Sequence, residues 1–350
     1  MTFSTKNRRD TYKARLSPRT DRYETNAGLT KRDKYTYLAD DQLDIVKYNY
    51  TGTTQDRTVD YNYDAAGNRT TVSDSAGQSI ASYTTNSLNQ YATMGGQTEN
   101  YDSNGNLAYG TATGNIIYNH DAQNRLTATQ GGSPNASLSY DARNRCVKRV
   151  LPFTTGSGTT TTYLVWDGWS LVAEYTMASG YNGSGSVNIP LGEARRYVHG
   201  AAVDEILLAI APAAAQTVHH VHDALGNVTA LTDASGAVVE RYTYDVFGKA
   251  TILNASGTVL TASAYGNRFQ FTGREWLAEL NVYDYRNRMY APGMGRFLET
   301  DPINYAAGDV NIYRYVGNDP MDYADPLGFE KQTKNVKLST WLVHSIDYNL

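Results

Sequence analysis

The sequence predicts an all-β protein built from repeated hairpins. Tyrosine supplies 29 residues, against 7 Phe and 4 Trp, and a short Tyr-Asp unit recurs about every 20 residues. Apolar and polar residues alternate at period two, and no stretch keeps helical periodicity over three or more turns. Tyrosine suits a sheet with a partly dry face, because its ring packs across strands while its hydroxyl reaches a partner or water.

The composition argues against several other classes of protein. With 350 residues and 41% hydrophobic content, the chain has enough apolar material for a buried core, which excludes intrinsic disorder. A net charge of -4 gives no bulk attraction to nucleic acid, so we expect no nucleic-acid partner. The longest apolar stretch, residues 206–215, is far shorter than the roughly 20 residues of a membrane helix. The first residues lack the apolar segment of a signal peptide.

The N-terminal segment, residues 1–39, is basic. Ten Lys and Arg outnumber four Asp and Glu in its first 35 residues. We expect a solvated, loosely ordered segment, because acids interrupt the basic run; a nucleic-acid-binding arm is the alternative interpretation.

Residues 40–190 carry the repeat. The unit is an aromatic, any residue, an aromatic, Asp, two small or polar residues, Gly or Asn, then Asn and Arg or a substitute. Its length fits a strand, a turn and a returning strand at roughly 3.3 Å per residue. Asp and Asn beside Gly favour tight turns, because these residues tolerate positive φ. The Asp anchors, which continue beyond residue 190, are Asp64, Asp102, Asp121, Asp141, Asp223 and Asp245.

Residues 191–329 contain a denser series of blocks. These are RYVHG (196–200), DALGNVTALTD (223–233), YDVFG (244–248), FQFTGRE (269–275), YDYRNRMY (283–290), GRFL (295–298), NIYRYVGNDP (311–320) and DPLG (325–328). With the preceding repeats, they resemble the YD repeats and repeat-associated core of Rhs proteins, of the C component of insecticidal Tc toxins and of the teneurins.

The resemblance implies a spiralling sheet of YD hairpins that forms a hollow shell, here a partial one, closed by the Rhs core as a plug. It also implies that the shell encapsulates a C-terminal effector, usually a toxin, of which residues 330–350 would be a stub. The implied partners are this cargo, another chain or a further N-terminal part that completes the shell, and export machinery. The implied location is outside the cell or on its surface.

The closing motif carries the implied chemistry. Cores of this family resemble aspartyl autoproteases that act once, cutting just after the motif. Here the cut falls between Phe329, which stands where Leu is usual, and Glu330. By residue matching, Asp325 and Asp301 are the catalytic carboxylates and Arg288 supports them. The supporting motif residues are Pro320, Pro326 and Gly328.

Paired carboxylates suit amide hydrolysis without a cofactor or metal. Two carboxylates that share a site do not both ionise easily, so one stays protonated and polarises the carbonyl while the other activates water. The alternative is structural, because Asp-Pro commonly begins a turn, and we expect Asp319 to have that role.

Three other features have two interpretations each. His219, His220 and His222 beside Asp223 invite a metal site, but no further ligands are suitably spaced, and we favour histidines that replace Tyr in a repeat strand. The segment 166–169, with two Trp, is either a sugar-stacking platform or, as we favour, a degenerate repeat turn. The single Cys146 excludes an intramolecular disulfide and is expected to be inert.

Two rival functions stay open at this level. One is a cell-surface protein that binds carbohydrate through its Tyr-rich sheet and has no catalysis. The other is an inert, truncated Rhs fragment in which the aspartates no longer assemble.

Overall fold

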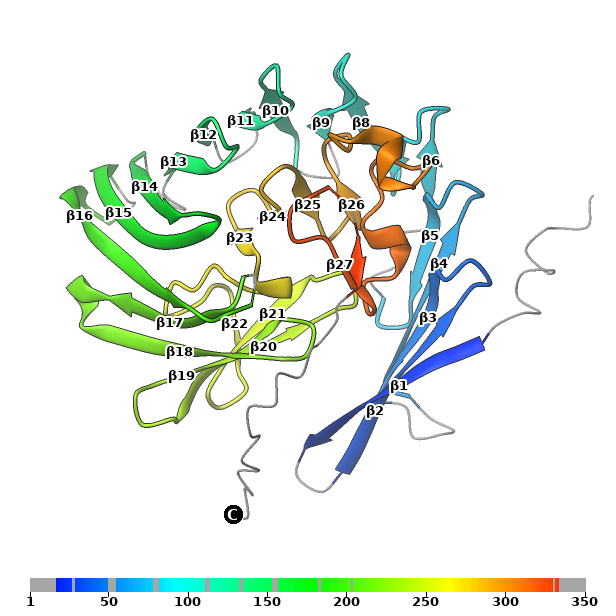
Figure 1. The fold of residues 1–350 in the computed structure, drawn as a ribbon, viewed down its shortest axis with the longest axis horizontal. Coiled ribbons are helices and arrows are strands. Elements are labelled where there is room, and N and C mark those ends of the chain that lie inside the picture. Colours follow the sequence, from blue (N-terminus) through cyan, green and yellow to red (C-terminus); the bar gives the residue numbers. More distant parts are fainter. Residues whose placement is uncertain are drawn as a thin grey trace, which may run out of the picture.

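The computed structural model is an almost entirely antiparallel β structure (Figure 1). It describes residues 17–26, 29–49, 55–77, 82–110, 114–131, 135–152, 157–181, 184–202, 204–329 and 331–333. Among these residues the only helices are the short 3-10 turns η1 (Pro212–Ala214), η2 (Phe271–Gly273), η3 (Asn304–Ala307) and η4 (Val316–Asn318). The predicted all-β class is confirmed.

The first sheet has five strands that pair in chain order. They are β1 (Ser17–Asn26), β2 (Leu29–Tyr37), β3 (Leu43–Tyr48), β4 (Arg57–Tyr63) and β5 (Arg69–Asp74). Within the N-terminal segment, residues 1–39, β1 pairs with β2, and residues 1–16 lie outside the described residues. Tyr35 and Tyr37 are buried and lie two residues apart, on one face of β2, so they anchor this strand in the core.

The second sheet continues the chain-order pairing through seventeen strands. They are β6 (Tyr83–Thr85), β7 (Tyr91–Met94), β8 (Gln97–Tyr101), β9 (Leu107–Gly110), β10 (Ile116–His120), β11 (Leu126–Gln130), β12 (Ser137–Tyr140), β13 (Cys146–Pro152), β14 (Thr159–Asp167), β15 (Ser170–Tyr181), β16 (Ser186–His199), β17 (Ile206–Ala211), β18 (Gln216–His222), β19 (Val228–Thr232), β20 (Val238–Tyr244), β21 (Ala250–Asn254) and β22 (Val259–Leu260). We call strands β1–β22 the wall. The boundary expected at residue 191 lies inside β16, because the repeat units continue to Asp245.

The repeat unit has a defined local structure. In the copy at Asp64, one carboxylate oxygen accepts the backbone N–H groups of Ala66 and Asn68, both at 2.9 Å, and the other accepts the Asn68 side-chain amide at 2.8 Å. Gly67 between them has φ +75°. The Tyr63 hydroxyl donates to the Leu43 carbonyl at 2.9 Å. The unit therefore needs Asp to cap the turn and Tyr, rather than Phe, to bind a neighbouring strand.

The plug, residues 267–329, fills the inside of the curved wall (Figure 1). It contains a four-stranded sheet and a terminal strand that pairs with residues beyond the plug. These strands are β23 (Glu275–Leu277), β24 (Val282–Asp284), β25 (Met289–Ala291), β26 (Arg296–Phe297), β27 (Tyr323–Ala324) and its partner β28 (Gln332–Thr333). A buried aromatic cluster that includes Tyr285, Tyr290 and Tyr315 packs at its centre, with the Tyr290 and Tyr315 rings 4.3 Å apart. The tyrosines thus form a packed interior here rather than the lining of a wet cavity.

The plug is bound by the same turns that define the repeat. The Asn311 side chain donates to the Asn68 Oδ1 atom at 2.7 Å, and Arg296 donates to the same oxygen at 2.7 Å. The Tyr313 hydroxyl donates to the Gly105 carbonyl at 2.6 Å. The Asn of the unit therefore both closes its own turn and presents an acceptor to the plug.

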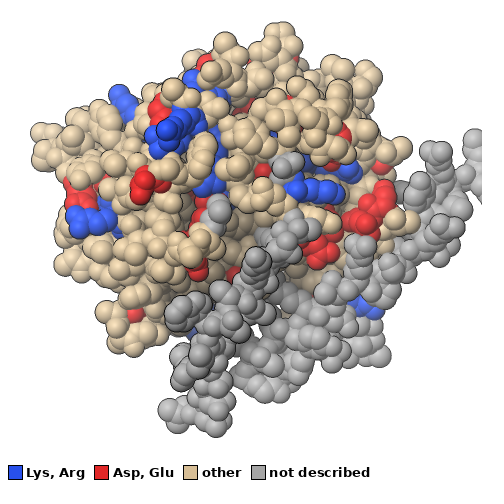
Figure 2. Space-filling view, in the orientation of Figure 1, with Lys and Arg blue, Asp and Glu red and all other residues tan. Residues whose placement is uncertain are grey.

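The visible surface is mostly uncharged, and Lys, Arg, Asp and Glu form small separate groups on it (Figure 2). This distribution agrees with the low charged fraction of 19%. In the described part of the chain, no helix has the length and apolar character needed to cross a membrane.

Candidate active site

Three of the residues chosen from the sequence meet at one point of the plug. Arg288 lies in the turn before β25, Asp301 follows β26, and Asp325 follows β27. The Arg288 Nη2 atom is 3.0 Å from the Asp301 Oδ2 atom and 3.0 Å from the Asp325 Oδ2 atom. All three residues are buried. The structure therefore brings the two carboxylates onto the same guanidinium nitrogen.

Each aspartate also uses its other oxygen for a local turn. The Asp301 Oδ1 atom accepts the Ile303 N–H at 2.9 Å, and the Asp325 Oδ1 atom accepts the Phe329 N–H at 2.9 Å. The Asp-Pro turn and the carboxylate pair thus coexist, because each role uses a different oxygen. The contact to Phe329 brings Asp325 next to the residue at which the sequence predicts the cut.

Burial controls the protonation of the site. It raises the pKa of Asp325 and of Asp301 above their usual values, while the Arg288 guanidinium acts in the opposite direction. Burial also lowers the pKa of Arg288. The Asp325 carboxylate further raises the pKa of Asp301 by repulsion. The pair therefore favours a state in which one carboxyl group keeps its proton.

The closing motif, residues 325–329, lies directly against this pair. The Arg288 Nε atom donates to the Gly328 carbonyl at 2.8 Å. Gly328 has φ +68°, and a Cβ atom there would lie 2.6 Å from the Tyr285 carbonyl oxygen. Phe329 and both aspartates line a cavity of about 60 Å³, which is more than the roughly 10–15 Å³ that a water molecule needs. The predicted partner of the cut, Glu330, lies outside the described residues.

The other predicted motif residues are placed differently. Pro326 follows Asp325 in the turn, and its carbonyl is bound by Arg286. Pro320 is buried away from the carboxylate pair and lines a second, larger cavity. Asp319 is buried close to Tyr37, whose pKa it helps to raise. The sequence analysis missed Arg286, although its place between two aromatic residues in a dense polar block was a usable signal.

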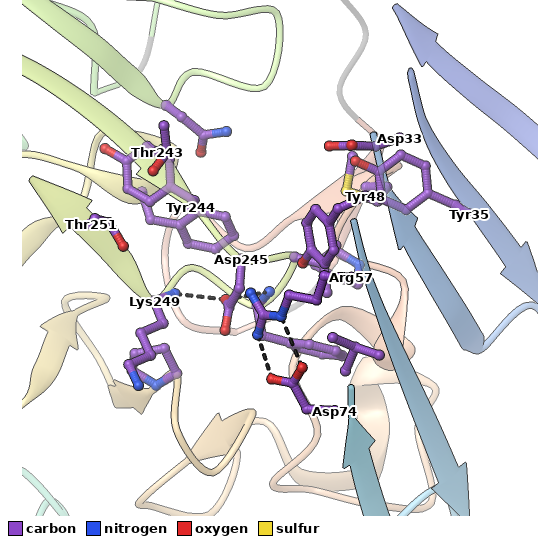
Figure 3. A pocket seen from close by; sticks show the side chains of 18 of the residues that line it. Asp33, Tyr35, Tyr48, Arg57, Asp74, Thr243, Tyr244, Asp245, Lys249 and Thr251 are labelled. Carbon is purple, nitrogen blue, oxygen red and sulfur yellow. Dashed lines mark hydrogen bonds and ion pairs between the residues drawn. The ribbon is translucent and has the colours of Figure 1, made fainter. Parts of the chain in front are cut away.

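The second cavity, of about 850 Å³, lies between the first sheet and strands β20 and β21 (Figure 3). Arg57 binds Asp74 through both carboxylate oxygens, at 3.0 and 2.7 Å, and its guanidinium lies 5.1 Å from the Tyr48 ring centre. Burial raises the pKa of Asp245, which caps the turn that leads to Lys249. The lining is therefore polar and aromatic, with both signs of charge.

The remaining candidates have structural roles. His220 binds the Asn267 side chain at 3.1 Å, and among the described residues no three His, Cys, Asp or Glu side chains converge as metal ligands would. Trp166 donates to the Cys146 carbonyl at 2.7 Å, and residues 168–169 form the hairpin turn between β14 and β15. Cys146 is buried, and burial raises the pKa of its thiol. A thiol in this state is a poor nucleophile.

Comparisons with known proteins decide the family. Residues 222–259 match the family model described as RHS Repeat. A tRNA3(Ser)-specific nuclease, WapA of Bacillus spizizenii, is 30% identical over an alignment of 283 residues that covers 76% of this chain. The chain is an Rhs/YD-repeat protein. A double-stranded DNA deaminase toxin A of Burkholderia cenocepacia is 27% identical over an alignment of 240 residues that covers 65% of this Rhs/YD-repeat chain.

Solved structures agree on the fold. A crystal structure of a TcdB2-TccC3-Cdc42 protein matches 88% of this Rhs/YD-repeat protein with a TM-score of 0.62 at 16% identity, over 17% of that chain. A structure of the Photorhabdus luminescens Tc holotoxin pore matches 89% with a TM-score of 0.61 at 15% identity, also over 17% of its chain. The Rhs/YD-repeat protein spans only 10% of the WapA relative and 16% of the deaminase toxin.

Proposed function

We propose that this Rhs/YD-repeat protein is the encapsulating shell of an Rhs-type toxin and that it releases a C-terminal effector by aspartyl self-cleavage between Phe329 and Glu330. One observation carries the proposal: Asp301 and Asp325 bind the same Arg288 nitrogen, and Asp325 also binds the Phe329 backbone. The names of two relatives, a nuclease and a deaminase toxin, support a toxin context.

The chemistry is a single hydrolysis. The ionised carboxylate removes a proton from a water molecule as the water oxygen attacks the Phe329 carbonyl carbon. The protonated carboxyl group donates to the carbonyl oxygen, where negative charge develops. The C–N bond then breaks, the Glu330 nitrogen takes a proton, and the products are a Phe329 carboxylate and a Glu330 amine. Arg288 holds both aspartates throughout by charge-assisted hydrogen bonds.

The proposal also assigns a path outside the cell. Export machinery would carry the shell with its cargo, and another chain or a further N-terminal part would complete the wall. β1 is an edge strand of the first sheet. An edge strand pairs readily with a further strand, which supports completion of the wall by such a partner.

Intact mass measurement of the purified chain tests the self-cleavage. We expect the wild type to lose the mass of residues 330–350 and to end at Phe329, and Asp325→Asn and Asp301→Asn to stay uncut. Asp309→Asn is the matched control, because Asp309 lines the same small cavity but binds Arg314 instead of Arg288. A folded wild-type chain that stays intact contradicts the proposal.

Encapsulation has a separate test. A small, protease-sensitive domain is fused after residue 350, and its digestion is followed in the uncut Asp325→Asn background. Protection of the fused domain, relative to the same domain alone, supports a shell that encloses its cargo. Digestion at the same rate argues against one.

The larger cavity favours carbohydrate binding as a second candidate function. Its Tyr48 ring and its Arg57–Asp74 pair offer a stacking surface and hydrogen-bonding groups. This function predicts saturable glycan binding, measured by calorimetry, that Arg57→Ala abolishes. If the protein binds no member of a broad glycan panel, carbohydrate binding is excluded as its function.

A further inference from the structure

We propose that Arg286 and Asn287 are positioning residues that fix the register of the cleavage motif, and that their contacts with the wall make self-cleavage depend on a formed wall. The inference rests on the proposed self-cleavage, and it assigns a regulation to that same site.

Three consecutive side chains bind three consecutive carbonyl groups. Arg286 donates through Nη1 to the Pro326 carbonyl. Asn287 donates through Nδ2 to the Leu327 carbonyl at 2.9 Å, and Arg288 donates through Nε to the Gly328 carbonyl at 2.8 Å. A slip of the motif by one residue would break this series and leave buried donors unpaired, which is unfavourable. The series therefore defines which peptide bond reaches the carboxylate pair.

The turn that carries these side chains is itself tightly fixed. Arg286 has φ +70°, an uncommon conformation for a residue other than glycine, and its N–H donates to the Asp284 carboxylate at 2.6 Å. The Tyr285 N–H donates to the Arg288 carbonyl at 3.0 Å, which closes the turn. Strained backbone persists where its surroundings fix it, and here it directs successive side chains at the motif.

The wall holds Arg286 in place. Asp204, between β16 and β17, accepts hydrogen bonds from its Nη2 atom at 2.5 Å and from its Nη1 atom at 3.2 Å. The Trp169 carbonyl, between β14 and β15, accepts from the Nη2 atom at 3.1 Å. Burial and the nearby Arg274 both lower the pKa of Arg286, whereas the Asp204 carboxylate, with a smaller effect from Asp284, stabilises its cationic form.

The wall also holds Asn287. The Asn144 side chain, in the repeat turn between β12 and β13, donates to the Asn287 Oδ1 atom at 3.1 Å. This contact fixes the orientation of the Asn287 amide, so that its Nδ2 atom faces the Leu327 carbonyl.

Arg288 is held differently. Its side-chain partners are Asp301, Asp325 and the Ile312 and Gly328 carbonyls, and all of them belong to the plug. The carboxylate pair can therefore form from the plug alone. The register of the motif depends on contacts with the turns of three wall hairpins. In a chain without those hairpins, Arg286 and Asn287 would lose these contacts, and the motif would no longer be held in one position.

The test compares the rates of self-cleavage after refolding from denaturant, measured by intact mass. We expect Arg286→Lys, Asn287→Ala and Asp204→Asn each to slow the cut by about 10- to 100-fold, the loss expected from a misplacement of up to about 1 Å. Arg149→Lys is the matched control. Arg149 is also a buried arginine that links wall and plug, through Glu275, but it does not touch the motif.

Two readouts separate positioning from general damage. The slowed variants should keep the shape of the wild-type pH profile, because the carboxylate pair is unchanged, whereas Arg149→Lys should lose thermal stability and keep its rate. Wild-type rates in Arg286→Lys and Asp204→Asn would overturn the inference. So would an equal slowing in Arg149→Lys.

A third readout does not need cleavage. In the uncut Asp325→Asn background, where the side-chain oxygen can still accept the Phe329 N–H, amide hydrogen exchange at Gly328 and Phe329 is compared with and without Arg286→Lys. Faster exchange supports the inference even if the wild type never cuts, which would reject only the proposed function. Unchanged exchange overturns the inference.

Discussion

Gly328→Ala is the substitution whose effect the structure specifies most closely. An Ala at this position must adopt φ near +68° with its Cβ atom 2.6 Å from the Tyr285 carbonyl oxygen. The left-handed backbone alone costs about 1 kcal/mol. Ordinary contact between such atoms begins near 3.4 Å, so the motif must also move away from a backbone atom that belongs to a closed turn. A displacement of about 1 Å at a reacting group costs roughly 100-fold in rate.

The matched control is Gly236→Ala. Gly236 has φ +84°, and a Cβ atom there meets nothing within 4 Å, so its substitution carries only the backbone cost. We expect Gly328→Ala to cut about 100-fold more slowly than the wild type in an intact-mass time course, and Gly236→Ala to cut at the wild-type rate. Both should lose no more than about 1 to 2 kcal/mol of unfolding free energy, because the motif can undock locally. A Gly328→Ala chain that cuts as fast as Gly236→Ala refutes the proposed seating of the motif.

Three further predictions concern pH and reactivity. Because burial raises the pKa values of Asp301 and Asp325, the rate of self-cleavage should rise as the pH falls from neutral towards those values, and a pH-independent rate argues against a shared proton. Burial lowers the pKa of His220 from 6.5 to about 4, so protonation favours the unfolded chain. The contribution of His220 to the free energy of unfolding should be fully present above pH 6.5 and should fall by up to about 3 kcal/mol as the pH drops from 6.5 through 4. Urea titrations at several pH values should show a smaller fall in His220→Gln. Cys146 should resist thiol reagents until the chain unfolds, and rapid labelling of the native protein would contradict its buried position.

The wall could be predicted because its rules are local. The turn at Asp64 is closed by hydrogen bonds that span at most four residues, so the spacing of Asp, Gly and Asn is visible in a single unit. The side chain of Tyr63 reaches 20 residues back to Leu43, which is still one repeat away. In the N-terminal segment the basic composition conceals the spacing of Tyr35 and Tyr37, which are buried, so the sequence alone does not indicate the β1–β2 pairing.

The carboxylate pair could be located only through resemblance, since Asp-Pro by itself predicts a turn. The contact between Asp325 and Arg288 joins residues that are 37 positions apart, and no local sequence pattern specifies it. The contacts of Asn287 with Asn144, 143 residues away, and of Arg286 with Asp204 depend on how the wall curves around the plug. Curvature accumulates from many strand twists, and the sequence of one hairpin does not specify it.

Because the strands of the wall pair in chain order, they can assemble in sequence while the polypeptide is being synthesised. Within each sheet of the wall, consecutive strands pair across short loops, whose closure is fast, whereas Asn318 must reach Gln42 across 276 residues. As a polypeptide emerges from its N-terminus, the hairpins can pair one after another before the plug residues exist. Anything encoded after Phe329 is made last, next to a wall whose strands have already had time to assemble.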